Sequence, residues 1–387
     1  MIYVHVPFCR SFCTYCDFYS EVAAKCRNSE AASMQESMFM DFAEALTVEV
    51  QSRSEEISDE VNTLYIGGGT PSVLPLSAFS RLLEALRSVG HGGPYDEFTV
   101  EVNPEDIVEK GMEYVEGLLD MGVNRISMGV QSFDDSVLRF MNRRHDADTA
   151  VAAYRILEDA GVRNISIDLI FGLPQLTSSA WEYTIQRALD ISSRGIKPRH
   201  ISSYQLSVEP GSMLARLVEQ GRWSEAPEDV CREQYEILCS KLADAGYRHY
   251  EISNFAMDGF EARHNSAYWR HVPYVGFGPG AHSFRRNEKR QWNKSDLNAY
   301  MKNPSAVHEY EILTEDQLVL ERIMLALRTS EGIDESFLLL HADPDGLERA
   351  LCAGNLERIS CSVSEGARLR IPESRFFVSD AIISSLI

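Results

Sequence analysis

The chain lacks both of the hydrophobic segments that would direct it into or across a membrane. No run of eighteen apolar residues occurs in its 387 residues, so we expect no membrane-spanning helix. The start, Met1-Ile-Tyr-Val-His-Val-Pro7, has no basic stretch followed by an apolar one and has the pattern of a β-strand instead. We therefore expect no secretion signal and a cytoplasmic location.

Basic residues are scarce relative to acidic ones. Lys and Arg total 37 against 58 for Asp and Glu, which gives a formal net charge of −21 at pH 7. Such a surface repels the phosphates of nucleic acids, so we expect no nucleic-acid partner. A small-molecule site can still be locally basic.

Cysteines with the spacing of a disulfide framework are also lacking. Of the eight cysteines, three lie within eight residues and the others are scattered. Disulfide scaffolds are typical of short secreted chains, so we expect the scattered cysteines to be free thiols in a reducing compartment. They are Cys26, Cys231, Cys239, Cys352 and Cys361.

The first half contains a regular alternation of strands and helices. Short β-branched runs are separated by segments with apolar residues at helical spacing. The expected strands are 2–6, 61–66, 97–102, 125–130, 164–171 and 200–206, and the expected helices are 39–52, 77–89, 112–120, 147–160 and 179–193. Six βα units predict an α/β fold with a parallel sheet, either an open sheet or a partial (β/α)6 barrel. In both folds, chemistry occurs at the carboxyl ends of the strands.

The second half follows a different pattern and predicts further units. The expected domains are residues 1–210, an extension at 211–303 and a C-terminal domain at 304–387. The last begins with a helix at 314–328 that has Thr314 as its N-cap. Shorter helices and a hairpin of 368–371 with 376–378 predict a small, mostly helical, winged-helix-like domain.

Cys9, Cys13 and Cys16 lie on one short segment after the first expected strand, with the spacing C-x3-C-x2-C. Thiolates are soft ligands that suit iron–sulfur clusters and zinc. Three of them can hold three irons of a cubane and leave the fourth iron open. The alternative is a zinc site with His5 as fourth ligand, but zinc sites usually separate cysteine pairs by a longer loop. The spacing therefore favours a [4Fe–4S] cluster.

The motif and its surroundings resemble the radical S-adenosylmethionine (SAM) enzymes, in which this spacing follows the first strand. Further segments, in the same order over about residues 2–300, resemble the oxygen-independent coproporphyrinogen III oxidase group. They are Tyr3-Val-His-Val-Pro-Phe-Cys9, Tyr15-Cys-Asp-Phe18, Gly67-Gly-Gly-Thr-Pro-Ser72, Glu101-Val-Asn-Pro104, Gly129-Val-Gln-Ser-Phe-Asp134 and Ile167-Asp-Leu-Ile-Phe-Gly-Leu-Pro174.

The resemblance implies a partial (β/α)6 TIM-like barrel whose cluster binds SAM at its open iron. Glu101 can accept from the SAM ammonium, Arg143 can pair with its carboxylate, and Asp168 can hold ribose hydroxyls. The full implied SAM set is Tyr3, Gly68, Gly69, Thr70, Glu101, Gln131, Arg143 and Asp168. Arg144 follows directly, so the choice between the two arginines stays open.

Two departures from the porphyrinogen oxidases resemble a sister group, the HemW-type haem chaperones. The oxidases carry a further cysteine two residues after the third, where this chain has Phe18, and they have an extension before the first strand. The pattern H-N-x-x-Y-W, typical of the HemW group and associated with haem, is also present. It assigns haem binding to His264, Asn265, Tyr268 and Trp269.

The residues alone leave the iron ligand of such a haem open. A histidine nitrogen or a tyrosine oxygen can ligate the iron. His271 and His282 are near in sequence, and Arg263 or Arg270 can pair with the propionates. The alternative interpretation of the motif is an aromatic structural turn close to the cluster.

Three functions are compatible with these patterns. The first is a haem chaperone that binds haem and a SAM-ligated cluster and delivers haem to acceptor proteins, such as respiratory haem enzymes. The second is oxidative decarboxylation of coproporphyrinogen III, and the third is a non-enzymatic zinc or iron–sulfur module. Phe18 and the motif beginning at His264 favour the first. Whether SAM is cleaved, whether the chain forms a homodimer and whether it associates peripherally with a membrane stay open.

Overall fold

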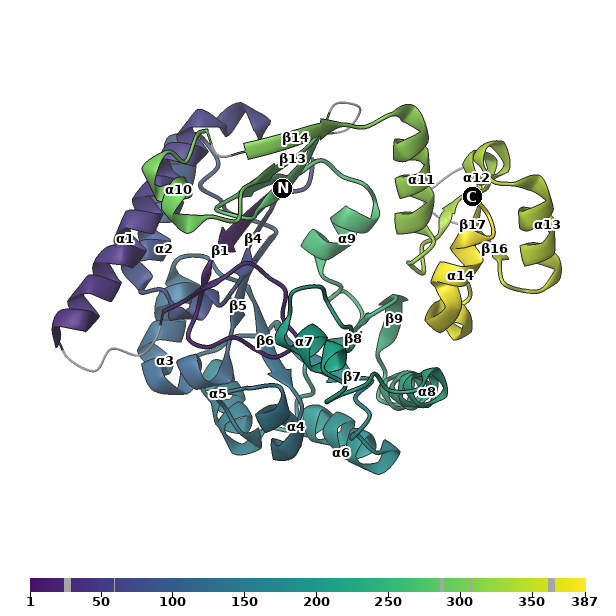
Figure 1. Cartoon of the computed structure of the whole chain (residues 1–387), viewed down its shortest axis with the longest axis horizontal. Coiled ribbons are helices and arrows are strands. Elements are labelled where there is room, and N and C mark those ends of the chain that lie inside the picture. Colours follow the sequence, from purple (N-terminus) through teal and green to yellow (C-terminus); the bar gives the residue numbers. More distant parts are fainter. Residues whose placement is uncertain (24–28, 59, 286–288, 307, 361–365) are drawn as a thin grey trace.

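An open sheet of nine strands organises most of the chain (Figure 1). The computed structural model describes residues 1–387 except 24–28, 59, 286–288, 307 and 361–365. The strands are Ile2–Val6 (β1), Thr63–Gly68 (β4), Glu97–Val102 (β5), Arg125–Gln131 (β6), Ile165–Phe171 (β7), His200–Gln205 (β8), Arg248–Glu251 (β9), Asn254–Ala256 (β10) and Val275–Phe277 (β11). Their order is β11-β1-β4-β5-β6-β7-β8-β10-β9, so two different strands form the edges and the sheet does not close into a ring.

Six neighbouring strands, β1 and β4 to β8, run parallel, as the alternating sequence pattern predicts. β11 adds in parallel beside β1, and the antiparallel pair β10 and β9 extends the other edge beside β8. Residues 211–303 thus contribute three strands to the main sheet. The fold is a partial (β/α)6 barrel of the α/β class with added edge strands.

Helices connect the parallel strands and cover the outer face of the sheet (Figure 1). They are Ser29–Ser52 (α1), Leu76–Ser88 (α2), Pro104–Asp120 (α3), Asp135–Phe140 (α4), Ala147–Asp159 (α5) and Ser178–Leu189 (α6), with Met213–Glu219 (α7) and Glu228–Asp244 (α8) following β8. One helix begins earlier than predicted, and another is preceded by a helical segment that the sequence did not predict. Gly111, with φ of 70° and ψ of −168°, is not helical and divides α3 into two helical segments, so the predicted helix at 112–120 is confirmed as the second segment. α1 starts at Ser29 rather than 39.

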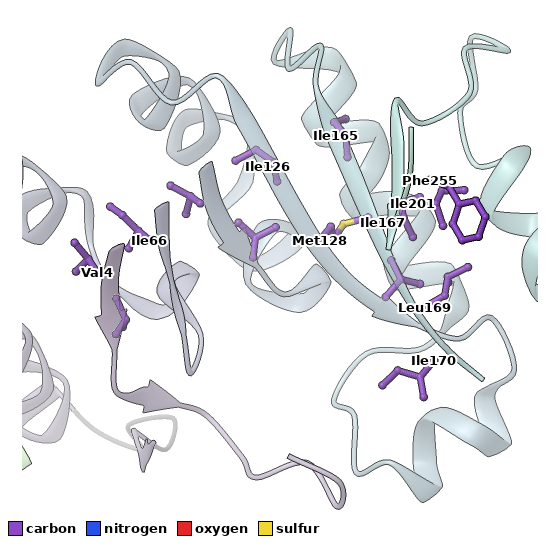
Figure 2. Close-up of a cluster of buried hydrophobic side chains, with 14 of the residues drawn as sticks. Val4, Ile66, Ile126, Met128, Ile165, Ile167, Leu169, Ile170, Ile201 and Phe255 are labelled. Carbon is purple, nitrogen blue, oxygen red and sulfur yellow. The ribbon is translucent and has the colours of Figure 1, made fainter. Parts of the chain in front are cut away.

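Side chains alternate along the parallel strands, with apolar residues toward the helices and polar residues toward the inside of the partial barrel. On β6, Ile126 and Met128 are at most 1% exposed and join a core shared with the neighbouring strands (Figure 2). Burying each such side chain stabilises the fold by about 1.5–3 kcal/mol. Arg125, Ser127 and Gly129 alternate with them and line an internal cavity. The inner side of the sheet is therefore polar.

A second, three-stranded sheet lies beside α1 and β11. It is formed by His282–Arg285 (β12), Lys289–Asn293 (β13) and His308–Ile312 (β14), with Leu297–Lys302 (α10) between the last two. Among the described residues, none of the helices combines the length and hydrophobicity that a membrane span needs.

The C-terminal part forms a small winged-helix-like unit, to the right in Figure 1. Thr314 caps α11, and reciprocal hydrogen bonds with Gln317 complete a capping box, which confirms the predicted helix start. The elements are Glu315–Ala326 (α11), Ile333–Asp334 (β15), Glu335–His341 (α12), Pro344–Cys352 (α13), Glu357–Ser360 (β16), Ala367–Arg370 (β17), Glu373–Val378 (η3) and Ser379–Ser384 (α14).

The predicted hairpin of 368–371 with 376–378 is wrong. β17 pairs with β16, and residues 376–378 belong to the 3-10 helix η3. Phe376 is fully buried, and its ring meets that of His249 edge to face at 4.9 Å between centroids. The apolar run therefore anchors the C-terminal unit against β9 and does not form a strand.

Candidate functional site

A cavity of ≈ 570 Å³ lies inside the partial barrel, below the loops at the carboxyl ends of the parallel strands. Its lining brings together most of the residues that the sequence predicts for the cluster and SAM, and one of the four predicted for haem. They are Cys9, Cys13, Cys16, Gly68, Gly69, Thr70, Glu101, Gln131, Arg143, Asp168 and Asn265. Tyr3, His264, Tyr268 and Trp269 are not part of this lining.

The loop that carries the cysteines is fixed by the end of α4. The Thr14 backbone N–H donates to the Met141 carbonyl at 3.1 Å, and its hydroxyl donates to the Phe140 carbonyl at 3.2 Å. The Asn142 amide donates to the Phe12 carbonyl at 2.6 Å. These bonds join segments far apart in sequence and hold the cysteine loop against the end of α4.

The three thiols are partly buried and free of disulfides. Burial raises the pKa of the Cys9 and Cys16 thiols, the latter to about 12. Cys9 Sγ lies 3.4 Å from Thr70 Oγ1, and Cys13 Sγ accepts from Arg143 Nη1 at 3.4 Å. Two of the three sulfurs thus already face a hydrogen-bonding group of the cavity wall.

The side chains of the cysteine loop are not arranged to bind one metal ion such as zinc, within the part of the chain that the structure describes. Within the described ranges, no group of three or more His, Cys, Asp or Glu side chains is arranged to hold one metal ion. His5, the fourth ligand of the zinc alternative, places Nδ1 3.1 Å from the Tyr3 hydroxyl and Nε2 2.8 Å from the Tyr19 carbonyl. Both of its ring nitrogens are therefore engaged.

The glycines at the end of β4 are required by the packing of the chain itself. A Cβ on Gly68, whose φ is +107°, would lie 2.7 Å from the ring of His5. A Cβ on Gly69 would lie 2.6 Å from the Phe8 carbonyl oxygen. Only glycine lets this turn approach β1 and the cysteine loop so closely.

Asn103, directly after β5, is a site residue that the sequence did not single out for a role. Its Oδ1 accepts from Arg143 Nη2 at 2.7 Å, and its Nδ2 donates to Thr70 Oγ1 at 3.2 Å. Arg143 Nη2 also donates to the Gly129 carbonyl at 2.6 Å. Arg144, by contrast, pairs with Glu105 at 3.8 Å, so the geometry selects Arg143 as the arginine beside the cysteines.

Two carboxylates face the cavity with raised pKa values. Burial raises the pKa of Glu101 to about 7, although the Tyr65 hydroxyl, which donates at 2.7 Å, and the Gly68 backbone N–H, at 3.1 Å, both favour the charged form. Burial also raises the pKa of Asp168, which accepts from Ser127 Oγ at 3.2 Å. Both groups would bind a cation more strongly than an exposed carboxylate does, because little water competes.

Gln131 stands at an irregular point of β6. Its φ of 69° is unusual for a residue other than glycine, and the register against β7 shifts there. Its Oε1, like Arg143 Nε, is buried without a hydrogen-bond partner among the described residues. Such strain and unpaired polar atoms are typical of sites that a ligand completes.

The haem motif lies on α9 (Arg263–Trp269), which packs across the amino-terminal ends of β4 and β5, away from the cysteine loop. His264 is 1% exposed, with Nδ1 2.9 Å from Thr63 Oγ1 and Nε2 3.0 Å from the Tyr268 hydroxyl. Burial lowers its pKa to about 3. The Glu97 carboxylate accepts from the backbone N–H groups of Arg263 and His264. In this conformation α9 lies at the amino-terminal end of the barrel, called the barrel floor. Both ring nitrogens of His264 are engaged in hydrogen bonds.

Of the scattered cysteines, Cys231, Cys239 and Cys352 are free thiols, as expected. Cys26 and Cys361 lie outside the described residues. Tyr3 lies next to the site, with its hydroxyl 3.1 Å from His5 Nδ1 and its ring 6.1 Å from that of Tyr65, which lines the cavity.

Comparisons with known proteins place this geometry in a family. The Radical SAM superfamily profile matches residues 3–188. Heme chaperone HemW of Bacillus subtilis is 33% identical over 340 residues, which cover 86% of this chain and 84% of that protein. Heme chaperone HemW of Mycobacterium tuberculosis is 30% identical over 391 residues, covering 100% and 94% of the two chains.

The fold also matches a solved structure. Coproporphyrinogen III oxidase (HemN) from Escherichia coli, a radical SAM enzyme, superposes with a TM-score of 0.78 over 99% of this chain and 89% of that chain, at 22% identity. At this identity the likeness concerns the fold alone. On the extended sequence similarity to the HemW proteins, this chain belongs to the HemW-type group of the radical SAM superfamily.

Proposed function

We propose that this chain is a haem chaperone that binds a [4Fe–4S] cluster, SAM and haem, and delivers the haem to acceptor haem proteins, such as respiratory enzymes. The observation that carries the proposal is one cavity lined by all three motif cysteines and by most of the implied SAM residues, in a HemW-type chain. Its relatives bear the name heme chaperone.

The cluster would be held by Cys9, Cys13 and Cys16. The fit is supported by their position on one fixed loop and by the donors that face two of the sulfurs, Thr70 and Arg143. Donors to coordinating sulfurs stabilise the negative charge of a thiolate-bound centre and tune its potential. When bound, such a cluster supplies one electron for cleavage of the S–C5′ bond of SAM.

The protein contributes the groups that would orient SAM. Glu101 accepts from its ammonium, the unpaired Nε of Arg143 donates to its carboxylate, and Asp168 accepts from ribose hydroxyls. Gln131 Oε1 is a further unpaired acceptor on the same wall. Tyr3 would act indirectly. Its hydroxyl bonds the His5 ring, and that ring packs against the Gly68 turn.

Haem binding through the α9 motif would require a conformational change. His264 cannot ligate iron while its two nitrogens bond Thr63 and Tyr268. We therefore expect α9 to leave the barrel floor when haem binds, which would free His264 and Tyr268 and bring Trp269 to a porphyrin face. The change would also release the Glu97 carboxylate from the start of α9.

The experiment is anaerobic reconstitution with iron and sulfide, followed by haem titration and by an assay for protoporphyrinogen IX. We expect a Soret shift on titration and no decarboxylated product. Hydrogen exchange of the amides of α9 should accelerate on haem binding. Product formation from coproporphyrinogen III, without a Soret shift, would replace the chaperone by the oxidase.

A matched pair of variants separates haem ligation from loss of stability. His264→Ala and His200→Ala each remove a buried ring with both nitrogens engaged, the latter with Ser166 and Tyr250. Only the first should weaken haem binding, by about tenfold or more. Equal weakening in both would assign His264 a structural role and move the haem site elsewhere.

A further inference from the structure

The first residue of β6 is a buried arginine whose donors are unused. Arg125 is 1% exposed, and its Nε and Nη1 have no hydrogen-bond partner within the part of the chain that the structure describes. It lines the floor of the cavity. An unpaired buried donor destabilises a fold, so two of them on one side chain mark a site that a ligand can satisfy.

The nearby carboxylates do not pair directly with this guanidinium. Burial opposes its charge, but attraction from Glu97, together with Asp168, keeps the pKa of Arg125 above its ordinary value. Both carboxylates already accept from other donors, Glu97 from the start of α9 and Asp168 from Ser127. The two carboxylates keep Arg125 charged. The Nε and Nη1 groups of Arg125 stay free to donate hydrogen bonds to a ligand.

A second polar group reaches the same floor from another element. Asn265, on α9, lines the cavity together with Arg125. It is the only one of the four motif residues to do so. An amide and a guanidinium that line one cavity can both donate to the oxygens of a carboxylate.

The end of the cavity where Arg125 lies differs from the end where Arg143 lies beside the cysteines. Arg125, Ser127 and Gly129 point inward at successive alternate positions of β6, and the Gly129 carbonyl accepts from Arg143. At about 3.3 Å per residue, the backbone of Arg125 lies ~13 Å along the strand from the Gly129 carbonyl that Arg143 bonds. Arg125 and the group that Arg143 bonds therefore lie toward opposite ends of β6.

We propose that Arg125 and Asn265 form a second ligand site, which binds the carboxylate of a small molecule at the barrel floor. A carboxylate fits better than a phosphate, because Glu97, Glu101 and Asp168 surround the single guanidinium and would repel a dianion. The site itself needs neither the cluster nor SAM. Its position beneath a bound SAM rests on the function proposed above.

The test is equilibrium dialysis with radiolabelled acetate, propionate, succinate and glutarate, at constant ionic strength, with and without the cluster. We expect at least one of these to bind saturably, with one molecule per chain, whether or not the cluster is loaded. Arg125→Gln should abolish this binding. Arg125→Lys, which keeps the charge and loses the planar fork, and Asn265→Ala should each weaken it about tenfold.

Arg194→Gln is the matched control, because Arg194 is an exposed arginine paired with Asp159 on the outer surface. It should bind the probes as the wild type does. If Arg125→Gln does not fold, Arg125→Lys and Asn265→Ala decide the matter. The proposal fails if none of the four probes binds, or if the lysine and alanine variants bind as tightly as the wild type. Failure to load the cluster, with probe binding intact, would count against the function above and leave this site standing.

Discussion

The side-chain oxygen of Asn103 accepts from Nη2 of Arg143 at 2.7 Å. Its amide nitrogen donates to Thr70 Oγ1, so one side chain orients both groups that face cysteine sulfurs. Asn103 lies at the end of β5, between the turn after β4 and the segment after β6, and it joins these three parts of the site. Loss of this amide should therefore affect ligand binding more than folding.

We predict that Asn103→Ala weakens SAM binding about tenfold, which corresponds to about 1.4 kcal/mol, and leaves cluster iron content unchanged. Asn103→Asp keeps the acceptor for Arg143 and loses the donor to Thr70, so its effect should be smaller. Equilibrium dialysis of SAM against reconstituted protein measures this. Asn62→Ala, which removes an exposed amide bonded to the Pro94 carbonyl, serves as control. Unchanged SAM affinity in Asn103→Ala would remove Asn103 from the site.

The raised pKa of Glu101 leads us to predict that SAM binding depends on pH near neutrality. Its pKa, raised by burial to about 7, means that much of the carboxylate is protonated at pH 6 and ionised at pH 8. Only the ionised form attracts the SAM ammonium, so affinity should increase as pH rises through about 7. Glu101→Gln should bind more weakly and with a flatter profile over the same range. A wild-type profile that is flat from pH 6 to 8 would contradict this role.

The parallel direction of the six strands could be predicted from sequence, because each βα unit is a local pattern. This predicted that Cys9, Thr70 and Gln131 would gather, since residues at the carboxyl ends of parallel strands meet at one edge, whereas Arg143 was implied by the family resemblance. The position of α9 could not be predicted in the same way. It depends on the contacts of His264 with Thr63 and of the helix start with Glu97, which join residues far apart in sequence.

The same limit explains why neither Arg125 nor Asn103 was assigned a role from the sequence. Arg125 opens a strand and, by pattern alone, is as consistent with a solvent-exposed strand end as with a barrel floor. Asn103 precedes Pro104 and has the composition of an ordinary helix start. Their roles follow from the curvature of the sheet and from which strands are neighbours, and neither quantity is contained in local periodicity.

His264 should contribute to stability as well as to any haem site. We predict that His264→Ala lowers the free energy of unfolding by about 2–4 kcal/mol, because it removes a buried ring and leaves Thr63 and Tyr268 without a partner. Its pKa falls from an ordinary 6.5 to about 3 on folding. The unfolded chain therefore takes up the proton first, and the contribution of neutral His264 is present above about pH 6.5 and is lost as pH falls toward 3.

Denaturant unfolding at pH 7.5 and pH 5 measures both effects. The wild type should lose stability over this interval, and the loss should be smaller in His264→Gln. His200→Gln is a useful comparison, because burial lowers the pKa of His200 in the same sense. If His264→Gln loses as much stability as the wild type between these pH values, the histidine is not held neutral on the barrel floor.

Glu49 provides a test of the fold that is independent of ligands. This fully buried carboxylate on α1 accepts hydrogen bonds from Arg53, the Gly278 backbone N–H, Asn293 and the Tyr300 hydroxyl, at 2.5, 2.9, 2.7 and 2.6 Å. It thereby joins α1 to the end of β11, to β13 and to α10.

We predict that Glu49→Ala lowers the free energy of unfolding by about 3–5 kcal/mol, because it removes the buried acceptor of four hydrogen bonds and leaves Arg53 with Glu56 as its remaining carboxylate partner. Glu49→Gln keeps the shape but replaces acceptor capacity by donors, so it should also destabilise, though less. Glu44→Ala, at an exposed position of the same helix that pairs with Arg81, should change stability by less than about 1 kcal/mol. Comparable effects of Glu49→Ala and Glu44→Ala would mean that the four-donor junction does not hold the second sheet to the barrel.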